Sequence, residues 1–155
     1  MKAFSNYLVE ATANWVRPDD AALRKEYQIE YKKHLIHELD SDVFPTEQSF
    51  LDAIAKSKVV TVTPAMDSKI ANRSGTKSMA DLLDLIKGYR SYPKFRNEKT
   101  LKALEKLITS GKPVDMPIVT KQGSHMRVFA GNTRMDIAFM HKINPKVIML
   151  ELPKN

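Results

Sequence analysis

Four consecutive residues, Gly131, Asn132, Thr133 and Arg134, have the types that hold an anion, and they lie where a predicted strand meets a predicted helix. The first turn of a helix has backbone N–H groups without intrahelical partners and the positive end of the helix dipole. Gly131 allows a tight bend and a close approach of a ligand to the backbone. Asn132 and Thr133 could cap the helix or donate to phosphate oxygens, and Arg134 could add a bidentate contact. The segment predicts a phosphate-binding turn, against the simpler interpretation of a turn, a cap and a solvated arginine.

A second group of residues, earlier in the chain, mixes aromatic rings with arginines. Arg90, Tyr92, Phe95 and Arg96 could stack a base and hold its phosphate. The same rings could instead pack under the helix that follows them. His125 could act as an acid or base, because imidazole titrates nearest to neutral pH, although a loop histidine is more often only solvated.

The basic excess of the chain lies in its second half. Residues 1–75 contain 10 Lys and Arg against 11 Asp and Glu, whereas residues 76–155 contain 15 against 7. This distribution favours a partner that bears phosphate, either a nucleotide or a nucleic acid. The alternative is that a small domain needs some net charge to remain in solution.

Composition excludes several classes of site. The 155 residues include no Cys, which removes disulfides, zinc–thiolate sites, iron–sulfur clusters and cysteine nucleophiles. His34 and His37 are three apart, a spacing that is common by chance, and a metal site needs a third ligand, so surface histidines are favoured and no metal site is predicted. Because no run of about 18 apolar residues and no secretory signal is found, we expect a cytoplasmic protein with no membrane partner.

The first sixty residues are predicted to be mainly helical. Tyr7–Trp15 could form a short helix, and a longer helix is expected from Asp19 or Asp20 to about Leu39, because apolar residues recur there every four positions. Pro45 suits the first turn of a third helix. That helix would bury Phe50, Leu51 and Ile54.

From residue 59 onward, strands and helices are expected to alternate. β-Branched residues predict a strand at Val59–Thr63, Asp67–Gly75 is expected to be a loop, and Ser78 with Asp81 resembles the cap of a helix that ends before Gly88. The other expected elements are a helix from Asn97 to Gly111 with Leu101, Leu104, Leu107 and Ile108 along its apolar side, strands at Met116–Thr120, Arg127–Ala130 and Lys146–Leu152, a turn at Gln122–Ser124 and a helix at Asn132–His141. The predicted fold is α+β, with a mainly helical region at residues 1–58 packed on a mixed α/β region at residues 59–155.

Around the Gly131 turn the chain resembles the ParB/sulfiredoxin superfamily. Tyr92–Asn97 is similar to the proline–arginine segment of that family, Lys112–Val119 to its Pro–Ile/Val–Val strand, and Arg127–Ala138 to its strand, Gly-x-x-Arg turn and helix. The three stretches follow the family's order, span roughly residues 89–152 and look like those of small bacteriophage-encoded members. The resemblance implies a ParB/sulfiredoxin-like fold and a phosphate held by Gly131–Arg134, with Arg96 facing it.

Members of this superfamily use the bound nucleotide in different ways. ParB proteins bind CTP and DNA, sulfiredoxin uses ATP, a serine kinase transfers phosphate, and some members are called nucleases. The lack of Cys excludes sulfiredoxin chemistry, and the lack of a helix-turn-helix segment after the final strand makes chromosome partition an unfavoured function. The kinase has an acid beside the glycine where this chain has Phe129–Ala130, so Asp136 or Asp115 would have to replace it, unless both are ordinary surface charges.

Three functions remain open on this basis. The first is binding of ATP or another nucleoside triphosphate with Mg²⁺, coupled to phosphotransfer in which the helix N-terminus and Arg134 neutralise the phosphoryl group. The second is a protein that binds DNA or RNA, or a nuclease, with the basic half as its footprint. The third is a phage effector without enzymatic activity that binds a host protein through its helical N-terminal third.

Overall fold

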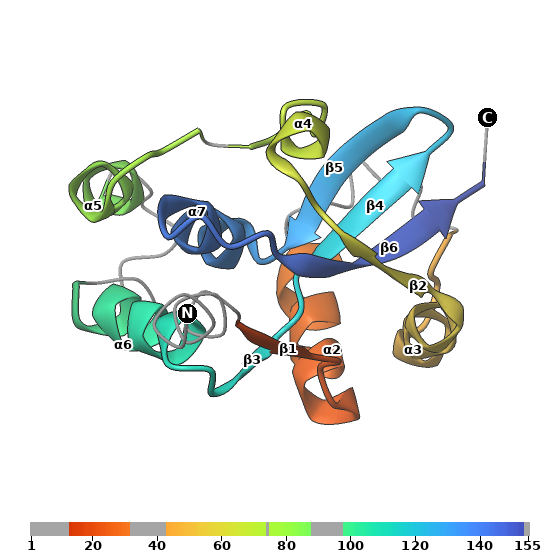
Figure 1. Cartoon of the computed structure of the whole chain (residues 1–155). Helices are drawn as coiled ribbons and strands as arrows, with labels where there is room; N and C mark the ends of the chain where they lie inside the picture. Colours follow the sequence, from red (N-terminus) through yellow and green to blue (C-terminus); the bar gives the residue numbers. More distant parts are fainter. Residues whose placement is uncertain (1–12, 32–42, 74, 88–97, 154–155) are drawn as a thin grey trace, which may run out of the picture.

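The computed structural model describes residues 13–31, 43–73, 75–87 and 98–153, which form an α+β structure (Figure 1). A four-stranded mixed sheet has the order β2-β6-β4-β5, and a separate pair of short strands has the order β1-β3. The elements are β1 (Asn14–Val16), α2 (Asp20–Glu26), the π-helical segment η1 (Tyr27–Tyr31), α3 (Glu47–Lys56), β2 (Lys58–Thr61), α4 (Pro64–Asp67), α5 (Met79–Lys87), α6 (Glu98–Thr109), β3 (Pro113–Asp115), β4 (Ile118–Gln122), β5 (His125–Ala130), α7 (Asn132–Met140) and β6 (Lys146–Leu152).

The centre of the larger sheet is the parallel pair β4–β6. Antiparallel β5 flanks β4 through a hairpin, and antiparallel β2 flanks β6 on the other side. The two central strands are the most apolar, with Val119 and Ile148 fully buried. This is the expected result of placing β-branched residues where both faces of a sheet are covered.

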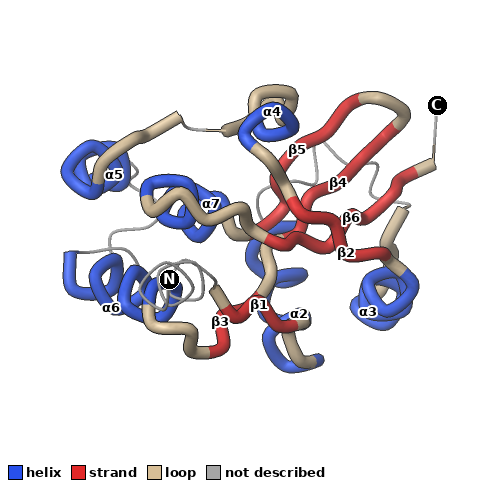
Figure 2. Tube along the Cα trace, viewed as in Figure 1, coloured by secondary structure: helices blue, strands red, loops and turns tan. Residues whose placement is uncertain are grey.

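Helices cover the sheet from different sides, as the secondary-structure view shows (Figure 2). α5, α6 and α7 gather at one end of the sheet, and α3 lies beside β2 at the other end (Figure 1). α7 contributes to two apolar clusters, because Ile137 and Ala138 join the larger cluster and Met135 joins the smaller one. α7 is therefore held by packing on two sides, which fixes the position of its N-terminus.

The N-terminal helices share the larger core with the sheet. Phe50 of α3 is completely buried, and its ring lies 5.3 Å from that of Phe129 in β5 and 5.7 Å from that of Tyr27. The Tyr27 hydroxyl also donates to the Phe44 backbone oxygen (2.9 Å). The expected packing of the helical region on the α/β part is thus present in the described residues.

One expected helix is partly a strand. Trp15, placed at the end of the predicted helix Tyr7–Trp15, lies instead in β1, where it pairs in parallel with Val114 of β3. The Met116 N–H extends this pairing by donating to the Val16 oxygen (2.8 Å). The prediction was wrong at Trp15 because a partner about a hundred residues away decides the conformation of a short apolar segment. The rest of that predicted helix, before residue 13, lies outside the described residues.

Three other boundaries also differ. Regular α-helix ends at Glu26 and gives way to a π-helical turn, and the predicted continuation to Leu39 lies outside the described residues. Pro45 precedes the third helix rather than opening it, because Thr46 is the N-cap and forms a capping box with Ser49. Asp67 ends the short helix α4, which begins at Pro64 and is capped by the Thr63 side chain, so the predicted loop starts after it.

Several expectations for the second half are confirmed. β6 has the predicted bounds, β2 overlaps the predicted strand, and the Ser78 hydroxyl accepts from the Asp81 N–H (3.1 Å) at the start of α5. The predicted strand at Met116–Thr120 lies two residues later, as β4. On α6, Leu101 and Ile108 are buried as expected, but Leu107 is exposed because it lies on the outer side of the helix. None of the described helices has both the length and the apolar character needed to cross a membrane.

Candidate phosphate-binding turn

Gly131 forms the junction between β5 and α7, and its conformation requires a glycine. Its φ is +97°, in the left-handed region that L side chains avoid. A Cβ built on it would lie 2.7 Å from the Cβ and 2.9 Å from the Cα of Pro117, which is closer than real contacts allow. Gly131 is the N-cap of α7 and offers no side-chain hydrogen bond to the first turn. The backbone N–H groups of that turn consequently have no side-chain cap.

Asn132 is not the cap that the sequence suggested, and its side chain binds a neighbouring segment. The Asn132 amide donates to the Asn72 backbone oxygen (2.8 Å), and its side-chain oxygen accepts from the Arg73 guanidinium. The Asn72 side chain in turn bonds both backbone groups of Val128 in β5, accepting from the N–H (2.6 Å) and donating to the oxygen (2.9 Å). Asn132 thereby fixes the start of α7 to a segment that is itself fixed to β5.

Asp136, a predicted catalytic residue, is held in a buried ion pair. Its side chain is 2% exposed, and one oxygen lies 2.6 Å from the Arg73 guanidinium. The second oxygen accepts from the Thr76 hydroxyl (3.0 Å). Arg73 is itself 8% exposed and also bonds Asp67 (2.5 Å). A carboxylate that compensates a buried guanidinium has a structural role, so this position does not favour Asp136 as a base.

Arg134 ties α7 to the segment between β3 and β4. Its Nη1 donates to the backbone oxygens of Asp115 (2.6 Å) and Met116 (3.4 Å), and its side chain is 15% exposed. Its Nη2 lies 4.0 Å from Oε1 of Glu26, at the end of α2. The arginine at the turn therefore already faces a carboxylate, which sequence analysis did not anticipate.

The other two acid–base candidates differ in their distance from the turn. The Asp115 backbone contacts Arg134, so the structure brings this half-buried residue to the start of α7. His125 begins β5, whereas the turn follows the last residue of that strand. A strand of this length separates them by roughly 17 Å. An extended strand thus carries His125 to the far end of the hairpin, and this position does not favour it as the acid or base of this turn.

The structure describes only one of the remaining predicted site residues. Thr133 is half-buried in the first turn of α7. Arg90, Tyr92, Phe95 and Arg96 lie outside the described residues. Among the residues that are described, no three His, Cys, Asp or Glu side chains come together as a metal site.

The sequence signal that could have located Asn72 and Arg73 is faint. They belong to a polar segment, Asp67–Gly75, that has no periodicity of its own. Their partners in β5 and α7 are 56 (Val128 from Asn72) to 63 (Asp136 from Arg73) residues away in the chain. Only the tertiary structure identifies them as the residues that hold the turn.

Compared with protein-family models, with curated proteins and with solved structures, this chain finds no match. The resemblance to the ParB/sulfiredoxin superfamily consequently rests on the three stretches quoted above and remains a prediction.

Proposed function

We propose that this protein binds the phosphate group of a nucleotide at the turn between β5 and α7. The observation that carries the proposal is the start of α7. A nine-residue helix begins directly after a left-handed glycine and lacks a side-chain cap. Such a start presents N–H groups and the positive end of the helix dipole to an anion.

The residues around the turn support this assignment in two ways. Thr133 and Arg134 belong to the first turn of α7, where a hydroxyl and a guanidinium can add hydrogen bonds to phosphate. Asn132 and Arg73 hold the turn in place. The Arg73 guanidinium donates to the Asn132 backbone oxygen, and the side-chain amide of Asn132, which follows Gly131 in the chain, donates to the Asn72 backbone oxygen. A rigid turn suits phosphate binding because no ordering is needed when the ligand arrives.

Glu26 is the group with which a phosphate would compete. Its carboxylate lies 4.0 Å from Arg134 and is 30% exposed. A phosphate, with more charge and more acceptor oxygens, would displace it at a modest cost, since partly exposed ion pairs contribute about 1 kcal/mol or less.

For phosphotransfer, Asp115 is the candidate base that best fits the geometry. Asp136 is paired with Arg73, and His125 is distant, whereas the Asp115 backbone adjoins Arg134. Mg²⁺ would arrive with ATP or another nucleoside triphosphate, because this ion is held mainly by phosphate oxygens with one or two carboxylates. In this proposal the helix N-terminus and Arg134 stabilise the charge on the transferred group.

The test is a thermal-shift series with ATP, ADP, CTP and GTP in the presence of Mg²⁺. A nucleotide at 100 times its Kd stabilises the folded state by about 2.7 kcal/mol. The informative variant is Thr133→Glu, which repels phosphate while its charge suits the N-terminus of α7. We expect the nucleotide-dependent shift to be lost in Thr133→Glu and kept in the neutral variant Thr133→Gln. The proposal fails if wild type shows no shift, or if both variants keep it.

A second candidate, nucleic-acid binding, is favoured by α6. Lys99, Lys102 and Lys106 are exposed and spaced along one side of this helix. If this stripe contacts phosphates, binding of a labelled DNA duplex should weaken with salt, with a slope of about −0.9 per phosphate contacted. Replacing all three lysines by Gln should reduce the slope, and an unchanged slope would exclude α6 as the footprint.

A further inference from the structure

β2 forms one edge of the four-stranded sheet, and its register shows which backbone groups point outward. The Ile148 N–H donates toward β4, to the Pro117 oxygen (2.9 Å), so the flanking residues Val147 and Met149 direct their backbone groups toward β2. These two pair with Val60 and Lys58. Because backbone groups alternate along a strand, those of Val59 and Thr61 point away from the sheet.

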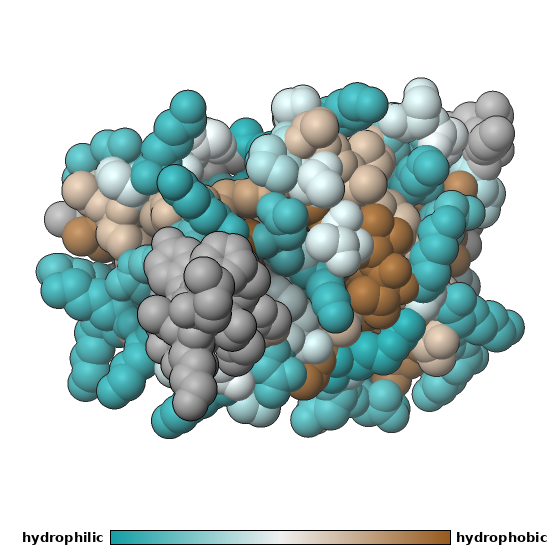
Figure 3. All heavy atoms as spheres, in the orientation of Figure 1, coloured by the Kyte–Doolittle hydropathy of each residue, from teal (hydrophilic) through white to brown (hydrophobic). Residues whose placement is uncertain are grey.

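The same edge exposes apolar surface. Val59 is 40% exposed, the most of any large apolar side chain among the described residues. In the space-filling view a hydrophobic patch lies over β2 (Figure 3). In the described part of the chain no strand pairs with this edge. Unpaired backbone groups beside exposed β-branched residues are a template for an added strand.

A cleft continues the line of β2 beyond its first residue. It has a volume of about 380 Å³ and is lined by Ala53, Lys56, Ser57, Lys58, Met149, Leu150 and Glu151. β2 pairs with β6 only as far as Met149, whereas β6 continues to Leu152 along β4. By the same alternation, the backbone N–H and oxygen of Glu151 face this cleft. An extended segment could therefore continue past the end of β2 against β6.

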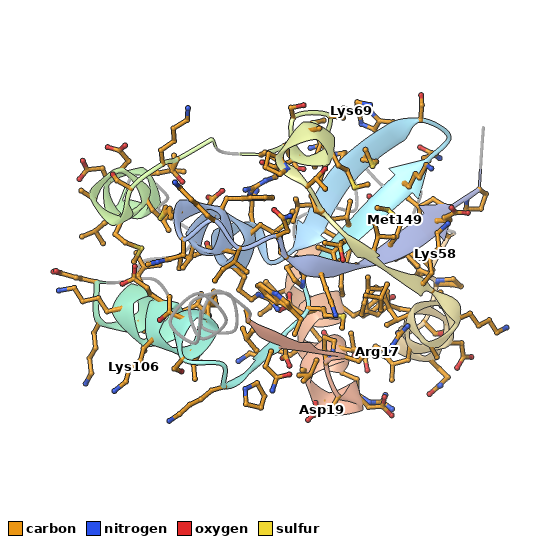
Figure 4. The ribbon with its side chains drawn as sticks, in the orientation of Figure 1. Arg17, Asp19, Lys58, Lys69, Lys106 and Met149 are labelled. Atoms are coloured by element: carbon orange, nitrogen blue, oxygen red, sulfur yellow. The ribbon has the colours of Figure 1, made fainter. Side chains whose placement is uncertain are left out.

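Cations surround the cleft and the β2 edge. Lys56 and Lys58 line the cleft, and Lys146 pairs with Thr61 at the other end of β2. Arg17 lies beside the cleft, next to the start of β2. Its guanidinium donates to the backbone oxygen of Ile54 (3.0 Å) and to that of Ser57 (2.6 Å), a residue that lines the cleft. The labelled side chains show Lys58 and its pairing partner Met149 on the sheet, and Lys106 on α6 on the opposite side of the molecule (Figure 4). The cleft itself is lined by two cations, Lys56 and Lys58, and one carboxylate, that of Glu151.

We propose that the outer edge of β2 and the adjoining cleft bind an extended acidic segment of a partner protein, which adds to the sheet as a fifth strand. Backbone hydrogen bonds to Val59 and Thr61 would give the segment its alignment, as in other cases of strand addition. Carboxylates of the segment would meet Lys56 and Lys58. A second copy of this chain fits less well, because it would bring Lys58 of both chains to the same edge. This interaction is independent of the nucleotide site proposed above.

The test measures binding of a fluorescent peptide of about eight residues, a length that covers a strand and its flanks, with alternating Val and Glu. Its counterpart has Lys in place of Glu. The decisive variant is Val59→Pro, which removes an N–H that points outward and leaves the bonds between β2 and β6 in place. Val59→Ala shortens the side chain and keeps the N–H. Lys58→Glu reverses a charge at the site, and Lys106→Glu makes the same change on α6.

We expect the Glu peptide to bind wild type, Val59→Ala and Lys106→Glu, and the Lys peptide not to bind. Val59→Pro and Lys58→Glu should each weaken binding by about tenfold or more, equivalent to about 1.4 kcal/mol. Circular dichroism should show that both variants keep the fold. The proposal is overturned if the Glu peptide does not bind wild type, or binds Val59→Pro equally well. A dimer of wild type in sedimentation that Val59→Pro dissociates would overturn it in favour of a second copy.

Discussion

The two edges of the four-stranded sheet differ in whether another segment of the described chain binds their outward-pointing backbone groups. At the β5 edge, Ile70 forms a bridge with Met126, the Ala71 N–H donates to the Met126 oxygen (2.9 Å), and the Asn72 side chain bonds both backbone groups of Val128. At the β2 edge, the described residues provide no such cover. Sheet edges are a liability unless they are covered or charged, so the difference separates an edge held by hydrogen bonds to a neighbouring segment from an edge without such bonds in the described residues.

The covered edge also has the ion pairs that hold α7. The segment that pairs with β5 continues into Arg73, which binds Asp67, Asp136 and Asn132 together. Covering the edge and fixing the candidate phosphate-binding turn are thus achieved by one stretch of chain. A helix start without a side-chain cap is thus held in place by contacts of Arg73 with Asn132 and Asp136 of the same helix.

The largest effect on the covered edge is expected from Arg73→Ala. Removing the guanidinium leaves the carboxylate of Asp136 buried without its cation, which typically costs about 3–5 kcal/mol. Urea unfolding would measure the loss. The double variant Arg73→Met with Asp136→Leu should lose less than Arg73→Ala, because it buries no charge. Equal losses of unfolding free energy in the two proteins would show that leaving the carboxylate of Asp136 without its cation has no cost of its own.

A smaller effect is expected from Asn72→Ala, and it compares the two edges directly. The change leaves the buried backbone groups of Val128 without their side-chain partner, at a cost of about 1–3 kcal/mol. Val59→Ala, at the open edge, should change the free energy of unfolding by about 0.5 kcal/mol or less. Amide hydrogen exchange should become faster at Val128 in Asn72→Ala and remain unchanged there in Val59→Ala. Equal destabilisation by the two substitutions would contradict the distinction between the edges.

The smallest effect is expected from Glu26→Gln, which tests whether the candidate phosphate-binding turn between β5 and α7 binds anions. Removing the carboxylate near Arg134 should increase the affinity for a nucleotide by a few-fold, in keeping with about 0.2–1 kcal/mol for a partly exposed ion pair. Isothermal titration at low salt would measure it, with Glu47→Gln, a change of the same type on α3, as the control. A decrease in affinity would show that Glu26 supports the ligand rather than competing with it.

Much of the second half could be predicted from the sequence because its signals are local. Lys146–Leu152 contains the continuous apolar run Val147–Leu150, Ser78 and Asp81 have the spacing of a cap, and Gly131 stands between a strand pattern and a helix pattern. Each of these depends on residues within a few positions of one another. The existence and place of the candidate turn were therefore predictable, and so was the α+β class.

The surroundings of the turn could not be predicted, because they depend on residues that are distant in the chain. Nothing near Asp136 in the sequence indicates that Arg73 neutralises it, and nothing near Trp15 indicates a partner strand at Val114. A propensity describes what a segment does alone, and a short apolar segment takes the conformation that its partner requires. His125 shows the same limit, because nearness in sequence gave no information about distance along an extended strand.

The sequence by itself determined where α7 begins and where β6 runs, and it predicts that the first residues of α7 suit an anion. Only the tertiary structure decided that Asp136 serves Arg73, that Arg134 faces Glu26, and that one edge of the sheet is covered while the other is open. The physical reason is that backbone conformation follows largely from neighbouring residues, whereas the partner of a charge or of a strand edge is set by how the whole chain packs.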